Sequence, residues 1–219
     1  MTQKLAEKVY ETLRERIIRG DLRPASPLDT HRIASDLQMS VTPVRDAIKK
    51  LEAEGYLEVI PRSGTFVRHF TLEDLIRGYE LVEALDGMAG FLVAERVREG
   101  AIDPEDLSTR LSALADEMDA HLEQDHVRRW AEADERFHAT VFEAAGNALI
   151  LNSYSTARSQ MRSVLSFISP IHVDRANSVR EHRQIIAALQ AGDRLKARDL
   201  CHSHRHQVRR ILKQLAEQM

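Results

Sequence analysis

Apolar residues recur every three or four positions through most of the chain, which is the spacing of amphipathic helices. The N-terminal stretch predicts a helix over residues 3–19, because four apolar side chains follow one another at intervals of four and Gly20 then ends the pattern. These side chains are Leu5, Val9, Leu13 and Ile17. We expect this face of the helix to be buried.

Two shorter helices are expected next. Thr30 is a candidate N-cap for a helix that ends at Leu37. Ser40 is the candidate for a second helix that continues to about Glu54, with Pro43 in the first turn, where a missing N–H costs little. Two short helices separated by so short a turn predict a helix-turn-helix.

The segment after the second of these helices has strand character. Residues 56–60 and 65–67 are rich in β-branched and aromatic side chains, and the sequence Pro-Arg-Ser-Gly between them favours a turn. A hairpin placed directly after a helix-turn-helix is a wing. The pattern therefore predicts a winged helix-turn-helix DNA-binding domain over residues 1–70.

From Thr71 onward the pattern is helical throughout. Thr71 with Asp74 resembles a capping box that opens a helix to about Arg98, and Asp103 followed by Pro104 is a strong start signal for the next helix. The remaining helices are expected at about 126–145, 147–168, 175–191 and 194–217, with breaks at Gly146-Asn147, Ser169-Pro170 and Gly192-Asp193. The fold class is thus mostly α, with residues 71–219 forming an all-α bundle of about six helices.

Polar residues interrupt the apolar stripes of three of these helices. In helix 126–145, Asp134 and His138 lie one turn apart on the inward side. His182 and His204 interrupt the stripes of the last two helices in the same way. The apolar residues assigned to the stripe of helix 126–145 are Val127, Trp130, Ala131, Phe137, Val141 and Ala145.

One carboxylate and three imidazoles facing inward predict a metal site. Burying an unpaired carboxylate is costly, whereas a divalent cation compensates all four groups at once. This ligand set suits a divalent transition metal such as zinc or nickel. The alternative for each histidine is a hydrogen-bonded core residue, and we expect Cys201 to be a small core residue.

Two further histidines in the last helix are interpreted differently. His202 and His206 are also four residues apart, but they share a predicted outer face with Arg198, Arg205 and Arg209. Charged and polar residues gathered on one face are typical of a solvated surface. We therefore expect these five residues to be exposed and exclude the two histidines from the metal site.

The second helix of the helix-turn-helix carries candidate DNA contacts. Ser40 and Thr42 at its start suit phosphate oxygens, and Arg45, one turn in, can reach a guanine edge in the major groove. At the predicted wing tip, Gly64 lets the backbone approach a minor groove and Arg62 supplies charge. The alternative is that Ser40 is only a cap and Arg45 a surface residue.

Composition narrows the class of protein. Of the residues, 30% are charged and 43% are hydrophobic, and no apolar run is long enough for a membrane segment. The N-terminus carries Lys4, Glu7 and Lys8 rather than a signal peptide. We therefore expect a cytoplasmic protein without a membrane segment. The single cysteine fits a reducing compartment. The net charge of −3 is uneven, because residues 1–70 carry 12 basic against 10 acidic side chains.

The first domain resembles the GntR family of bacterial transcription regulators. The resemblance is carried by residues 20–24 (Gly-Asp-Leu-Arg-Pro), 40–48, 51–55 (Leu-Glu-Ala-Glu-Gly) and 61–67 (Pro-Arg-Ser-Gly-Thr-Phe-Val), with Leu28, Ile33 and Ala34. Family members usually have glycine at Ala25 and a DNA-contacting arginine at Val41. Val41 offers only apolar contact, so the resemblance implies operator DNA as the partner but an altered operator sequence.

The remainder resembles the FCD effector domain of the FadR-type GntR subgroup. The matching stretches are residues 134–138, 146–147, 181–189 and 192–193, with Ala197 and His204. The resemblance implies that Asp134, His138, His182 and His204 are metal ligands and that a small carboxylate effector completes the coordination. Members often carry an arginine in the middle of the domain's first helix. It is absent from residues 81–86, and Arg158 and Arg162 are candidate effector-binding substitutes.

These inferences predict a homodimeric transcription regulator rather than an enzyme. Two recognition helices would bind a palindromic operator, and the carboxylate effector would control binding. Repression and activation both fit the sequence, and we take repression as the working assignment. Two alternatives stay open. The metal could be purely structural, or the chain could be a metal-dependent enzyme. The enzyme alternative is disfavoured because the sequence lacks a motif that pairs a metal with a general base, such as His-Glu-x-x-His.

Overall fold

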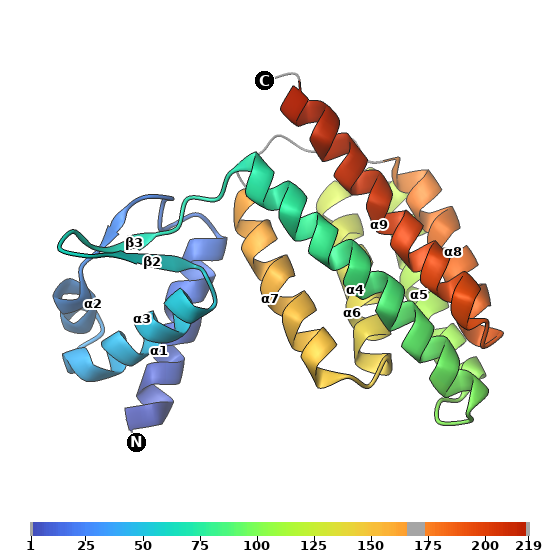
Figure 1. The fold of residues 1–219 in the computed structure, drawn as a ribbon, viewed down its shortest axis with the longest axis horizontal. Coiled ribbons are helices and arrows are strands. Elements are labelled where there is room, and N and C mark those ends of the chain that lie inside the picture. The colour runs from blue at the N-terminus through green and yellow to red at the C-terminus, as the bar shows by residue number, and fades with distance from the viewer. Residues whose placement is uncertain (1, 166–173, 218–219) are drawn as a thin grey trace. The chain divides into compact units, whose positions relative to one another are not determined.

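The computed structural model describes residues 2–165 and 174–217 of the chain. By its internal contacts the chain divides into two compact units, one of residues 1–75 with 158–170 and the other of residues 76–157 with 171–219. The described part contains nine helices and a single sheet of three strands (Figure 1). This confirms the mostly α fold class, and each unit is described by itself.

The first unit is a winged helix-turn-helix. Its elements are α1 (Thr2–Ile18), β1 (Pro27–Leu28), α2 (Thr30–Asp36), α3 (Val41–Ala53), β2 (Leu57–Ile60) and β3 (Gly64–Val67). The strands β2 and β3 pair antiparallel with Leu57 opposite Val67, which confirms the predicted wing. The strand β1, which was not predicted from the sequence, adds to the other edge of β3.

One apolar cluster fills the first unit. Val9, Leu13 and Ile17 of α1 are buried as the spacing predicted, whereas Leu5 is 38% exposed near the start of the helix. The cluster continues through α2, α3 and the strands with Ile33, Ala34, Val44, Ala47, Ile48, Leu51, Tyr56, Leu57 and Val67. These residues fix α3 against α1, and they leave the opposite side of α3 free of core packing.

The helix starts agree only in part with the sequence signals. Thr30 is not the N-cap of α2: the cap is Asp29, whose Oδ1 accepts from the N–H groups of His31 and Arg32 at 2.9 and 3.1 Å. Ser40 is the N-cap of α3 as predicted, but its hydroxyl makes no capping hydrogen bond. The capping box is confirmed, since Asp74 N–H donates to Thr71 Oγ1 at 3.1 Å and Thr71 N–H to Asp74 Oδ2 at 3.0 Å.

The remaining helices form the predicted bundle. They are α4 (Leu72–Arg98), α5 (Pro104–Glu123), α6 (Val127–Ala144), α7 (Ala148–Leu165), α8 (Arg175–Gln190) and α9 (Arg194–Glu217). The helix α5 starts at an Asp103 cap followed by Pro104, as expected. The predicted end of the fourth helix near 168 and the break at Ser169-Pro170 lie outside the described residues. None of the described helices is long and apolar enough to cross a membrane.

The apolar stripe of α6 is narrower at its start than predicted. Trp130, Phe137 and Val141 are buried, but Val127 is 45% exposed and Ala131 is also exposed. The first turn of α6 follows directly on a loop residue with positive φ, Asp125 (φ 51°), and only the later turns of the helix contribute an unbroken buried face. This face packs against α5.

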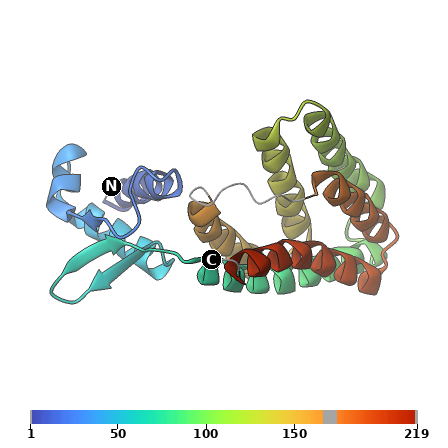
Figure 2. The same ribbon diagram turned by 90° about the horizontal axis from the view of Figure 1, so that it is seen from above.

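The helices α4 and α9 run antiparallel and very close together (Figures 1 and 2). A Cβ atom added at Gly90 of α4 would lie 2.7 Å from Cys201 Sγ and 2.9 Å from the carbonyl oxygen of Ala197, both on α9. At Gly87, one turn earlier, the nearest atom would be 3.4 Å away. Gly90 is therefore the position at which the two helices need the absence of a side chain.

This contact makes a stability prediction. We expect Gly90→Ala to lower the free energy of unfolding by about 1–3 kcal/mol, because the added methyl overpacks against backbone that cannot move away. Gly87→Ala is the matched control, since it gains the same helix propensity of about 1 kcal/mol without the clash. Urea denaturation of both variants is the measurement, and equal stability of the two would contradict the close packing of α4 on α9.

Candidate metal centre and DNA-binding surface

Three helices bring the four predicted metal ligands together. The helix α6 supplies Asp134 and His138, α8 supplies His182 and α9 supplies His204. One ligand atom from each lies within 4.8 Å of all the others. The three imidazoles are buried, His182 completely, while Asp134 keeps slight access to solvent.

Two imidazole nitrogens and one carboxylate oxygen face the same point. Nε2 of His138 and Nε2 of His182 are 3.3 Å apart. Oδ1 of Asp134 lies 3.4 Å from His182 Nε2 and 3.8 Å from His138 Nε2. These atoms are the ones that bind divalent metals in proteins, so the donor set and its convergence fit a metal ion.

Two further carboxylates orient the histidines from behind. Asp86 Oδ1 of α4 lies 3.2 Å from His138 Nδ1, and Glu181 Oε2 lies 2.7 Å from His204 Nδ1. A histidine whose Nδ1–H donates to a carboxylate presents the lone pair of Nε2 to a metal. Sequence analysis missed both carboxylates. The available signal for Asp86 was its helical spacing from the apolar residues Val82 and Ala89, both of which are buried with it.

Burial and charge set the protonation states of the ligands. Burial lowers the pKa of His182 to about 3 and, together with the charge of Arg205, holds the pKa of His138 well below its ordinary value. Burial alone would raise the pKa of Asp134, but His138, His182 and Arg205 hold it below the ordinary value. At neutral pH the imidazoles of His138 and His182 are therefore neutral and the carboxylate of Asp134 is ionised, as metal ligands must be.

Arg205 is not on the outer face of α9. Sequence analysis grouped it with exposed residues, but its side chain is 3% exposed and its Nε donates to Asp86 Oδ2 at 2.9 Å. The prediction was wrong because α9 packs against both α4 and α8, so that its buried arc is wider than one apolar stripe. Arg209 is also largely covered, whereas Arg198 is exposed as expected.

The other polar residues of α9 stay outside the site. His202 and His206 are each 52% exposed, as predicted, and both lie near Oε1 of Glu83 on α4, at 3.0 and 3.1 Å. Cys201 is buried beside Gly90, which agrees with a small core residue, and it is not one of the four clustered ligands.

The two candidate effector-binding arginines lie on α7. Arg158 is half-buried, and its Nε has no hydrogen-bond partner among the residues that the structure describes. The side chain of Arg162 lies outside the described residues. Their assignment to an effector stays a prediction.

The predicted DNA contacts lie at the start of α3 and at the wing. Ser40, Thr42 and Arg45 are all exposed, while Val41 is half-buried beside the core cluster. At the wing tip, Gly64 has φ 118° and a Cβ added there would meet nothing within 4 Å. Arg62 is exposed, with φ 67°. The start of α3 and the wing tip thus offer exposed donors and an open backbone of the kind that duplex DNA requires.

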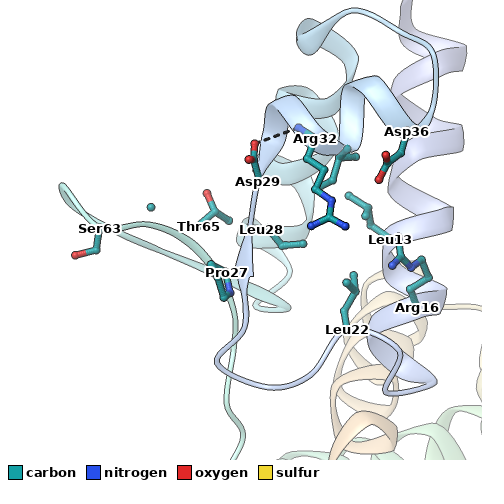
Figure 3. A pocket seen from close by; sticks show the side chains of 12 residues that line it. Leu13, Arg16, Leu22, Pro27, Leu28, Asp29, Arg32, Asp36, Ser63 and Thr65 are labelled. Atoms are coloured by element: carbon teal, nitrogen blue, oxygen red, sulfur yellow. Dashed lines mark hydrogen bonds between the residues drawn. The ribbon is translucent and has the colours of Figure 1, made fainter.

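A hollow of about 490 Å³ lies within the winged unit (Figure 3). It is lined by α1, β1, α2 and the wing tip, and its charged residues are two cations, Arg16 and Arg32, and two anions, Asp29 and Asp36. Because these charges balance, the hollow offers no preference for an anion.

Comparison with known families accounts for both units. A model described as bacterial regulatory proteins, gntR family, matches residues 5–67, and a model of the FCD domain matches residues 77–207. The chain belongs to the GntR family. As a GntR regulator with an FCD domain, it is a DNA-binding transcriptional regulator, and FCD domains commonly bind a metal.

Named relatives agree with this membership. The GntR chain is 30% identical to a probable D-xylose utilization operon transcriptional repressor of Paenarthrobacter nicotinovorans, over 86% of this chain and 80% of the relative. Its fold is similar to that of E. coli McbR/YncC (TM-score 0.68, 22% identity, 97% of this chain and 98% of the other). A putative GntR regulator of Rhodococcus sp. RHA1 gives the same TM-score of 0.68 at 23% identity, over 94% and 96%. Membership in a regulator family tells against the alternative of a metal-dependent enzyme.

The geometry predicts how the GntR chain holds a metal. We expect the wild type to bind one divalent ion per chain, and Asp134→Asn and His182→Gln to lose it, because each removes a converging ligand. Glu181→Gln should weaken metal binding about 10–100-fold through the orientation of His204. Elemental analysis after dialysis against a competing chelator is the measurement.

His202→Gln is the control for these variants, because it removes an exposed histidine of α9 outside the cluster. Loss of the metal from this variant, or its retention by both ligand variants, would place the metal elsewhere.

Proposed function

We propose that this chain is a regulator whose binding to operator DNA is controlled by a small carboxylate bound at a metal ion in the FCD domain. The observation that carries the proposal is the convergence of one carboxylate and three imidazoles inside a helical domain attached to a winged helix-turn-helix. A metal held by four protein groups keeps its charge inside the domain, where an acidic molecule is attracted to it.

The donor set suits zinc or nickel, and one of its distances fits a tetrahedral zinc ion. Two nitrogens at a Zn–N distance of about 2.0–2.1 Å lie about 3.3 Å apart on a tetrahedron. The observed distance between Nε2 of His138 and Nε2 of His182 is 3.3 Å. Neighbouring ligands of an octahedral ion at the same bond length would lie only about 3 Å apart. Zinc can expand its coordination, so that an additional oxygen ligand from a carboxylate is chemically reasonable.

DNA recognition is assigned to α3 and the wing. Ser40 and Thr42 would bind phosphates at the start of α3, and Arg45 would read a base edge. Arg62 and Gly64 would approach the adjacent minor groove. We further infer that two chains bind a palindromic operator as a homodimer, and that binding represses transcription, because a relative of the same domain composition is named a repressor.

The recognition helix can be tested on an operator selected from random-sequence duplex DNA. Arg45→Ala should weaken binding to the selected site by about 1–3 kcal/mol, because a base contact is lost while the fold of the unit is untouched. Arg128→Ala is the charge-matched control, since it removes an exposed arginine of α6. Gel-shift titrations at several salt concentrations are the measurement. Equal affinity of the two variants would remove Arg45 from the proposed interface.

A purely structural metal is the competing role, and His138→Ala separates the two. If the metal senses an effector, this variant should stay folded, bind the operator, and no longer respond to acetate, lactate or succinate in the gel shift. If the metal is structural, the variant should unfold. The appropriate reference is the chelator-treated wild type, because bound metal itself stabilises the folded state by about 4 kcal/mol at a thousandfold excess over Kd.

Thermal denaturation of His138→Ala and of the chelator-treated wild type distinguishes a sensing metal from a structural one. If both proteins unfold in similar cooperative transitions and His138→Ala still binds the operator, the result favours sensing. If neither protein has a folded state, the result favours a structural ion.

A further inference from the structure

Arg205 is a buried cation with spare hydrogen-bonding capacity. Its side chain is 3% exposed, and one nitrogen, Nε, donates to Asp86. A guanidinium has five N–H donors. Nη2 of Arg205 is buried and has no hydrogen-bond partner among the described residues. Buried donors are nearly always paired in folded proteins, so this group points to an acceptor that is supplied by another molecule.

The position of Arg205 places it beside the metal ligands. Asp86 bridges the two, with Oδ1 at 3.2 Å from His138 Nδ1 and Oδ2 at 2.9 Å from Arg205 Nε. After burial itself, the charge of Arg205 is the next largest contribution to the lowered pKa of His138, and it also acts on Asp134. An anion near the ligand cluster is therefore within the electrostatic reach of Arg205.

The buried charges fix the charge of the missing partner. The balance counts the carboxylates of Asp86 and Asp134 and the guanidinium of Arg205, of which Asp134 keeps slight access to solvent. Glu83 is also buried, but Arg209 pairs with it at 2.7 Å, so this ion pair adds no net charge. With a dication added, two negative and three positive charges leave one positive charge uncompensated. A monoanion neutralises it, whereas a dianion would reverse it inside a domain where uncompensated charge is costly. Glu181 does not enter this balance, since it is partly exposed and hydrogen-bonded to Asn177 as well as to His204.

Two buried tyrosines interact electrostatically with the guanidinium of Arg205. They are Tyr79 of α4 and Tyr154 of α7. A phenol offers a donor and an acceptor to the hydroxyl or carbonyl of an organic acid. The surroundings of Arg205 thus combine an anion-binding cation with neutral polar groups.

We propose that Arg205 binds the effector carboxylate directly, and that the effector is a small monocarboxylate held between this guanidinium and the metal centre. The inference rests on the proposed function, and it adds a ligand-binding residue from the last helix and a charge for the ligand. The planar guanidinium matches the two oxygens of a carboxylate better than an ammonium group does.

The test compares two arginines of α9 that both pair with a buried carboxylate of α4. Arg205 pairs with Asp86, and Arg209, one turn later, pairs with Glu83 at 2.7 Å. Zinc-loaded full-length wild type, Arg205→Gln, Arg205→Lys and Arg209→Gln are titrated calorimetrically with acetate, lactate and succinate, and the zinc content of each is measured. Arg205→Lys keeps the charge, which guards against a failure of Arg205→Gln to fold.

We expect Arg205→Gln to retain one zinc per chain and to bind acetate and lactate at least tenfold more weakly than wild type. Arg209→Gln should stay within twofold of wild type, and Arg205→Lys should fall between the two. Wild type should bind acetate and lactate more tightly than succinate.

Three results would overturn the inference while leaving the proposed function intact. The first is equal carboxylate affinity of Arg205→Gln and Arg209→Gln. The second is loss of zinc from the Arg205 variants, which would make Arg205 a positioning residue for His138. The third is tighter binding of succinate than of acetate and lactate by the wild type. If zinc-loaded wild type binds none of the three acids, the proposed carboxylate control fails and the inference fails with it.

Discussion

The carboxylate of Asp86 connects three helices of the FCD domain. It lies on α4, accepts from Arg205 of α9 and contacts His138 of α6, and it is almost completely buried. In such surroundings the carboxylate and the guanidinium depend on one another, because removal of either leaves the charge of the other uncompensated. The orientation of His138 and the position of Arg205 therefore both depend on one buried acidic residue. Around it, Gly90 lets α4 and α9 approach closely enough for that residue to reach both neighbours.

Sequence alone predicted the parts of this arrangement that interrupt a single apolar stripe. Asp134, His138, His182 and His204 each replace an apolar residue at helical spacing, and the structure brings their ligand atoms together. Arg205 could not be found in this way, because it follows His204 directly and adjacent residues point about 100° apart on a helix. Both are buried only because α9 packs on two sides, against α4 and α8. The width of a buried arc depends on tertiary contacts that periodicity does not contain.

The winged unit shows the same division between local and non-local information. The hairpin was predictable from β-branched residues around a Pro-Arg-Ser-Gly turn, since both strands and the turn are adjacent in sequence. The strand β1 was not, because its two residues carry no period and pair with β3 from almost forty residues away, with Pro27 opposite Phe66. The cap of α2 was displaced by one residue for a simpler reason. Asp29 and Thr30 are both good caps, and the carboxylate of Asp29 accepts two backbone N–H groups.

The helix α4 follows the wing directly in the chain. This helix starts at Leu72, only a few residues after the wing strand β3 ends at Val67, and the capping box of Thr71 and Asp74 fixes its first turn. The same helix carries Asp86, which accepts a hydrogen bond from Arg205. A ligand shifts a conformational equilibrium only through contacts that differ between the states. A carboxylate bound to Arg205 would compete with or strengthen the contact of Arg205 with Asp86. It would therefore act on the one helix that continues, without another element between, from the wing into the effector domain.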